Sequence, residues 1–83
     1  MNISILSPDK EIFQGPITSV KVPGTTGQFE ILKGHAPIVS SLGNGTVRVL
    51  KEGGGKLSFT IEKGFVEVLK NEVSLLVQGV KEA

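Results

Sequence analysis

The stretch of sequence that decides the fold class is GNGTVRVLKEGGGKLSFTI, residues 43–61. Apolar and polar side chains alternate on both sides of its centre, at Val47 and Val49 and again over residues 57–61. A period of two places one set of side chains inside and the other in water, as in a half-buried β-strand. The glycines of Gly53-Gly54-Gly55 separate the two alternating segments, so residues 43–61 are predicted to form a β-hairpin with a flexible tip.

The same alternation recurs outside this hairpin, and turn signals divide the chain every eight to twelve residues. Apolar pairs flank a polar residue at Ile3 and Ile5, Val20 and Val22, and Phe29 and Ile31. The turn signals are Ser7-Pro8-Asp9, Gly15-Pro16, Pro23-Gly24, Gly34-His35-Ala36-Pro37, Gly43-Asn44-Gly45, Gly53-Gly54-Gly55 and Lys63-Gly64. Short strands at this spacing are typical of an all-β sandwich or barrel.

The segment 66–80 fits two structures. As an amphipathic helix it would bury a stripe spaced by three and four residues: Val66, Leu69, Val73, Leu76 and Val80. As a hairpin it would turn at Asn71-Glu72 and point these side chains inward: Val66, Val68, Val73, Leu75 and Val77. The five valines and the central Asn of this segment are weak helix formers, which favours the hairpin.

Composition excludes several classes of function. The 83 residues carry nine Lys plus Arg and eight Asp plus Glu, a net charge of +1 with no basic run, which argues against a nucleic-acid binder. There is no Cys and only one histidine, His35, so the usual sets of metal ligands are not available. A catalytic triad would have to use His35 with Asp9, the only aspartate, and no local motif activates a serine as a nucleophile. Leu57 stands where a phosphate-binding loop needs Ser or Thr. No catalytic residue, metal site or cofactor is predicted, and binding to another protein is the expected role.

The central segment Val22–Val39 closely resembles the epsilon subunit of rotary F-type ATP synthases. The resemblance rests on its Pro-Gly loop and on the turn Gly34-His35-Ala36-Pro37. Several flanking motifs agree with the family: Ser7-Pro8-Asp9, Phe13-Gln14-Gly15, the stretch Leu42–Val49 and Lys63-Gly64-Phe65-Val66-Glu67-Val68. Nearly all of residues 1–79 is covered.

The resemblance implies a flattened β-sandwich of about ten short strands in two sheets, with residues 65–78 as strands. It implies a non-catalytic rotor subunit of the central stalk, held between the gamma subunit and the c ring, that couples proton- or sodium-driven rotation to the alpha/beta catalytic head. The expected location is the cytoplasmic side of a bacterial inner membrane, with membrane association only through the complex.

The resemblance also assigns two docking surfaces. The surface facing the c ring would comprise Thr25, Thr26, Gly27 and Gln28, and the surface facing gamma would comprise Ser7, His35, Ile38, Val39, Ser40 and Leu42. Because Ile38 and Val39 are adjacent, they must point to opposite sides of a strand, so that one can enter the core while the other faces a partner. His35 has a second, structural interpretation, in which its ring fixes the turn before Ala36-Pro37.

The sequence departs from the family at two points. Relatives commonly carry an acidic residue at the position of Gln28 and glycine at that of Glu30. Residues two apart share a face, so we expect Glu30 to join the ring-facing surface and supply the missing charge. Many members also continue into an inhibitory two-helix region, whereas this sequence ends at Ala83. Residues 1–83 are therefore expected to form one sandwich domain without that region. The alternative is a free-standing sandwich that binds a protein or a small ligand in an apolar pocket.

Overall fold

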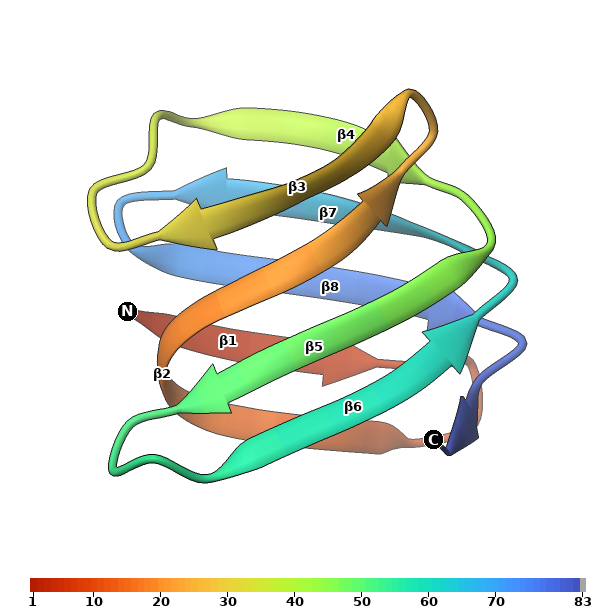
Figure 1. The fold of residues 1–83 in the computed structure, drawn as a ribbon, viewed down its shortest axis with the longest axis horizontal. Coiled ribbons are helices and arrows are strands. Elements are labelled where there is room, and N and C mark those ends of the chain that lie inside the picture. Colours follow the sequence, from red (N-terminus) through yellow and green to blue (C-terminus); the bar gives the residue numbers. More distant parts are fainter. Residues whose placement is uncertain (83) are drawn as a thin grey trace.

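The computed structural model describes residues 1–82, and this part of the chain is all-β. Its nine strands are β1 (Asn2–Leu6), β2 (Glu11–Gly24), β3 (Gly27–Leu32), β4 (Ile38–Leu42), β5 (Gly45–Lys51), β6 (Lys56–Ile61), β7 (Lys63–Leu69), β8 (Glu72–Gln78) and β9 (Lys81–Glu82) (Figure 1). The predicted β-sandwich is confirmed, with nine strands in place of the approximately ten expected.

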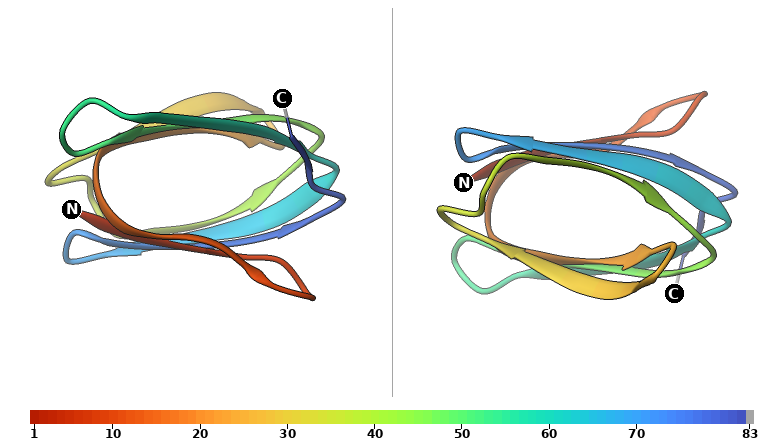
Figure 2. Two further views of the ribbon diagram at one scale, coloured as in Figure 1. Left: turned by 90° about the horizontal axis from the view of Figure 1, so that it is seen from below. Right: turned by 90° about the horizontal axis from the view of Figure 1, so that it is seen from above.

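Two layers face each other, and the long strand β2 belongs to both (Figure 2). Its first half pairs with β1 up to Pro16, and from Ile17 onward it pairs with β5 and β3. The layers are therefore parts of one hydrogen-bonded network, in the order β1-β8-β7-β4-β2-β5-β6-β9 with β3 on β2. The turn predicted at Gly15-Pro16 is wrong, because these residues lie inside β2 where its partner changes and the strand bends between the layers.

The core fills the space between the two layers. The alternating residues of the predicted hairpin supply much of it, since Val47, Val49, Phe59 and Ile61 are all buried. The other fully enclosed apolar side chains come from six further strands: Ile3, Ile5, Ile17, Val20, Val22, Ile31, Leu42, Val66, Val68, Val73, Leu75 and Val77. The alternating segments at residues 3–5, 20–22, 29–31, 47–49 and 57–61 therefore have one buried and one solvent-facing side, as predicted.

Residues 63–78 form the hairpin and not the helix. β7 and β8 pair antiparallel from Lys63–Gln78 to Leu69–Glu72, which leaves a two-residue turn at Lys70-Asn71. Both turn residues have positive φ, 51° and 64°, which is the type I′ geometry that suits the twist of a hairpin. The turn therefore lies one residue earlier than the predicted Asn71-Glu72. The five side chains predicted to point inward in the hairpin are buried.

Candidate partner-binding surfaces

One outer face of the sandwich is markedly more apolar than the other. Within residues 1–82, six large hydrophobic side chains are exposed: Leu6, Leu32, Val39, Phe65, Leu69 and Leu76. All except Leu32 lie on β1, β4, β7 and β8, the strands of one layer. We call the outer side of these four strands the β4–β1 face. Because a strand of a soluble sandwich normally turns polar side chains outward, this concentration indicates a surface that a partner covers.

Strand register arranges the exposed apolar side chains in a row. Leu6 of β1 is paired with Leu76 of β8, and Leu76 is paired with Phe65 of β7. Ser41 of β4 continues the row beside Phe65. A hollow of about 470 Å³ is lined by Leu6, Phe65 and Leu76 of this row and also by Pro8. The row is therefore a shallow apolar groove that crosses three adjacent strands.

The residues predicted to face gamma are only partly on this face. Val39 is 60% exposed on its outer side, as one of the two positions at Ile38-Val39 was expected to be. Ile38 is half-buried and packs against the core. Leu42 was placed on the surface incorrectly, because its side chain is 3% exposed and lies in the core. By strand alternation Ser40 shares the inner side with Leu42, and the outward position next to Val39 is Ser41.

The two remaining members of that set lie in turns at opposite ends of the face. Ser7, half-buried beside the apolar groove, donates its hydroxyl hydrogen to the carbonyl of Lys10. His35 is also half-buried, and its Nδ1 lies 2.7 Å from the carbonyl oxygen of Ala36. This contact fixes the turn before Pro37 and supports the structural interpretation of His35. The turn is further attached to the β7–β8 hairpin, because the Gly34 amide donates to Oδ1 of Asn71 over 2.9 Å.

The residues predicted to face the c ring gather at the turn between β2 and β3. Thr25, Thr26, Gly27 and Gln28 are all exposed there. The Thr25 amide donates a hydrogen bond to the carbonyl oxygen of Ser41, with 3.3 Å between nitrogen and oxygen, so this tip lies beside the end of β4. We call residues 25–28 the tip loop.

Glu30 follows the tip loop on the outer side of β3. It alternates with the inward-facing Phe29 and Ile31, so it shares a face with Gln28 as expected. Directly across the sheet Glu30 is paired with Lys21, and Lys21 is paired with Arg48. The carboxylate therefore has a cationic neighbour of its own on the adjacent strand.

Sequence reasoning missed four residues of the β4–β1 face: Leu6, Phe65, Leu69 and Leu76. Leu69 and Leu76 fitted the helix stripe and were therefore assigned to a core in the alternative structure. The signal that identifies them is an apolar residue in the polar half of an alternating strand. That signal can be recognised only once residues 63–78 are known to form a hairpin, because the same residues also fit a helical period.

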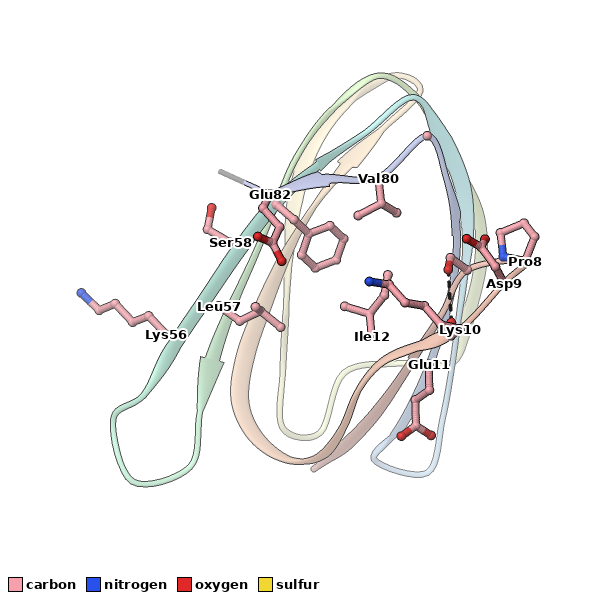
Figure 3. A pocket seen from close by; sticks show the side chains of 13 residues that line it. Pro8, Asp9, Lys10, Glu11, Ile12, Lys56, Leu57, Ser58, Val80 and Glu82 are labelled. Carbon is pink, nitrogen blue, oxygen red and sulfur yellow. Dashed lines mark hydrogen bonds between the residues drawn. The ribbon is translucent and has the colours of Figure 1, made fainter.

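A second hollow lies at the open edge of the sandwich and has a volume of about 850 Å³. Ile12, Leu57 and Val80 point into it from β2, β6 and the segment before β9 (Figure 3). The charged residues at this hollow are Asp9, Glu11 and Glu82 together with Lys10 and Lys56. Because the charged residues are of both signs, this hollow has no preference for a positively or a negatively charged ligand.

The described residues offer no metal cluster and no membrane-spanning helix. Among residues 1–82, no three His, Asp or Glu side chains come together as a set that could hold a metal ion. No helix long and apolar enough to cross a membrane occurs in the same part of the chain.

Comparison with known sequences decides the family. Residues 1–83 match the family described as the β-sandwich domain of the ATP synthase delta/epsilon chain. The chain belongs to this family. The epsilon chain of Leptospira borgpetersenii is 44% identical over 77 residues, which are 92% of this chain and 59% of that protein. The epsilon chain of Chlorobium limicola is 44% identical over 78 residues, which are 94% of this chain and 89% of its own length.

Solved structures of two ATP synthase complexes contain chains with the same fold as this chain. A chain in the mitochondrial ATP synthase of Euglena gracilis, described as OSCP/F1/c-ring, superimposes with a TM-score of 0.88 at 26% identity. The match covers 96% of this chain and 51% of the Euglena chain. A chain from the central stalk and c ring of the Tetrahymena thermophila ATP synthase has a TM-score of 0.80 at 16% identity, a likeness of fold alone. The chain thus spans about half to two thirds of the matched chains in these two structures.

Proposed function

We propose that this chain is a non-catalytic rotor subunit of the ATP synthase central stalk. It docks on the gamma subunit and on the c ring, and it couples ion-driven rotation of the ring to ATP synthesis in the alpha/beta head. The observation that carries the proposal is the β4–β1 face, where five of the six exposed large hydrophobic side chains gather in one layer. The family, and the ATP synthase complexes in which its structural relatives occur, support the same role.

Gamma is the partner that we assign to the β4–β1 face. Val39 belongs to both the apolar face and the residues that family resemblance directs toward gamma, and Ser7 lines the groove formed by Leu6, Phe65 and Leu76. A stable contact of this kind buries roughly 800 Å² on each partner and needs an apolar centre with a polar rim. The face provides that centre, and the half-buried His35 lies in the turn at one end of it, whereas Ser40 is on the inner side of β4.

The c ring is the partner that we assign to the tip loop. Thr25, Thr26, Gly27 and Gln28 are exposed polar or small residues, which suits a wet contact that turns with the ring and adds little apolar burial. Glu30 extends this surface and presents a carboxylate to a basic loop of the ring. The chain then reaches the membrane only through the complex, on the cytoplasmic side of a bacterial inner membrane, and the coupling ion is a proton or sodium.

Two variants with equal exposure at the parent residue test the assignment of gamma. Leu76 and Leu32 are each 51% exposed, but Leu76 lies on the β4–β1 face and Leu32 lies on β3 of the other layer. Leu76→Asp is expected to abolish retention of the chain on a complex of alpha, beta and gamma subunits in gel filtration. Leu32→Asp is expected to be retained like the parent.

Circular dichroism of both variants checks that the sandwich is intact, since each substitution is at an exposed position. Equal retention of Leu76→Asp and Leu32→Asp would overturn the assignment of gamma to this face. Failure of the parent chain to bind any ATP synthase subunit would instead favour the free-standing module, with the hollow at Ile12, Leu57 and Val80 as its binding site.

A further inference from the structure

Glu67 occupies the centre of the β4–β1 face. Along β7 it lies between the outward positions Phe65 and Leu69, which are 43% and 51% exposed. Across the sheet it is paired with Val39 of β4 on one side and with Ser74 of β8 on the other. A charged carboxylate therefore has exposed apolar side chains on three sides.

No cation of this face lies in register with Glu67. Lys63 is four positions away at the start of β7, beyond Phe65, and Lys70 lies in the turn past Leu69. The nearest charged residue across the strand pair is Glu72, which is diagonal to Glu67 because Ser74 is its direct partner. Diagonal positions are about 7–8 Å apart, so the two carboxylates repel each other weakly. The middle of the face is thus negative and lacks a compensating charge among its own neighbours.

A partner that covers the apolar side chains must also cover this carboxylate. Phe65, Leu69 and Val39 cannot be buried without removing water from Glu67, which stands between them. An ionised carboxylate buried without a donor is strongly unfavourable, whereas one that is paired with a cation and hydrogen-bonded is tolerated. The partner is therefore required to bring its own donor to this point.

We propose that Glu67 receives the ammonium or guanidinium group of a Lys or Arg side chain of gamma, within an otherwise apolar contact. This inference rests on the proposed docking of gamma at the β4–β1 face. It also defines the chemistry of the gamma segment, because apolar side chains must flank the cation to reach Phe65 on one side and Leu69 on the other. Successive outward residues of a strand are about 7 Å apart. A helix that carries apolar residues three or four positions before and after the Lys or Arg has suitable spacing.

The test compares two Glu→Gln variants in binding to the same complex of alpha, beta and gamma subunits. Glu67→Gln removes the charge at the centre of the face, and Glu52→Gln removes an exposed charge next to the glycine-rich tip of the β5–β6 hairpin. Affinity is measured by titration at 50 mM and at 500 mM NaCl. Glu67→Gln is expected to weaken binding about 30-fold or more at low salt, as for a charge pair that becomes buried, and to weaken the dependence on salt. Glu52→Gln is expected to bind like the parent at both salt concentrations.

Charge reversal identifies the partner residue. Glu67→Lys is expected to bind more weakly than Glu67→Gln, and one substitution among the Lys and Arg residues of gamma, to Glu, is expected to restore its binding. If Leu76→Asp loses gamma but Glu67→Gln and Glu52→Gln bind equally well, the charge pair is wrong and the docking face stands. If Leu76→Asp retains full affinity, the docking of gamma at this face is itself wrong.

Discussion

At Lys70 and Asn71 the backbone adopts the left-handed conformation, with φ of 51° and 64°. This conformation costs most residues about 1–2 kcal/mol, and Asn is one of the few that visit it readily. Asn71 Oδ1 also accepts a hydrogen bond from the Gly34 amide, which stabilises Asn71 in this turn. Lys70 has neither this hydrogen bond nor the preference of Asn for the left-handed conformation. Lys70→Asn is therefore expected to raise the free energy of unfolding by about 1 kcal/mol in a urea titration. Lys63→Asn, in the strand that precedes the turn, serves as the control and should give no gain, because Asn is disfavoured in strands.

Gly64 is constrained by the close approach of the neighbouring strand and not by its backbone conformation. A Cβ on this residue would lie 2.6 Å from the carbonyl oxygen of Leu76, which belongs to the backbone of β8 and cannot rotate away. Gly64→Ala is expected to lower the free energy of unfolding by about 1–3 kcal/mol, since the strand pair must move apart. At Gly43 the nearest atoms would be 4.0 Å away, an ordinary contact, so Gly43→Ala should be close to neutral. Similar unfolding curves for the two variants would show that β7 and β8 are not packed this closely.

At the scale of the element, neighbouring residues of β8 have opposite surroundings. Leu75 is fully buried and Leu76 is 51% exposed. Leu75→Ala is expected to lower the free energy of unfolding by about 2–5 kcal/mol, because it leaves a cavity in the core. Leu76→Ala should change it by about 0.5 kcal/mol or less, as at other surface positions. Thermal or urea denaturation measures both, and a larger loss for Leu76→Ala would favour the helix stripe over the hairpin.

These same elements show how far the sequence can be interpreted on its own. The β5–β6 hairpin was predictable, because Val47 and Val49 and then residues 57–61 alternate with the period of a strand on either side of Gly53-Gly54-Gly55. Residues 66–80 were not decided by pattern, since apolar residues stand on both outer and inner positions of β7 and β8 and so also fit a helical period. Gly15-Pro16 resembled a turn because these residues interrupt strands in general, yet here they allow one strand to bend between two layers.

At the scale of the whole molecule, the surfaces depend on which side of each strand faces the core. The tip loop was predictable through family resemblance, because a loop is exposed whichever way the flanking strands point. The gamma-facing set was not, because adjacent strand residues alternate between core and solvent. Leu42 belongs to the core and Ser41 to the surface. The apolar groove at Leu76 arises only when three strands distant in sequence are paired, so no local pattern reveals it.

The tip loop joins β2 to β3, whereas the apolar groove crosses β1, β8 and β7. We therefore expect that binding to the c ring and binding to gamma can be impaired separately by mutation. Glu30→Gln is expected to weaken docking on the c ring by up to about five-fold at low salt, as for an exposed ion pair, while its affinity for gamma stays at the parental value. The effect is limited further because Lys21 already lies opposite Glu30 in the sheet. Leu76→Asp is expected to have the opposite effect: it loses binding to gamma, while its affinity for the isolated c ring stays at the parental value. Binding of each variant to purified c ring and, separately, to the complex of alpha, beta and gamma subunits measures both. Should Glu30→Gln dock on the ring as tightly as the parent at low salt, Glu30 is not part of the ring-facing surface.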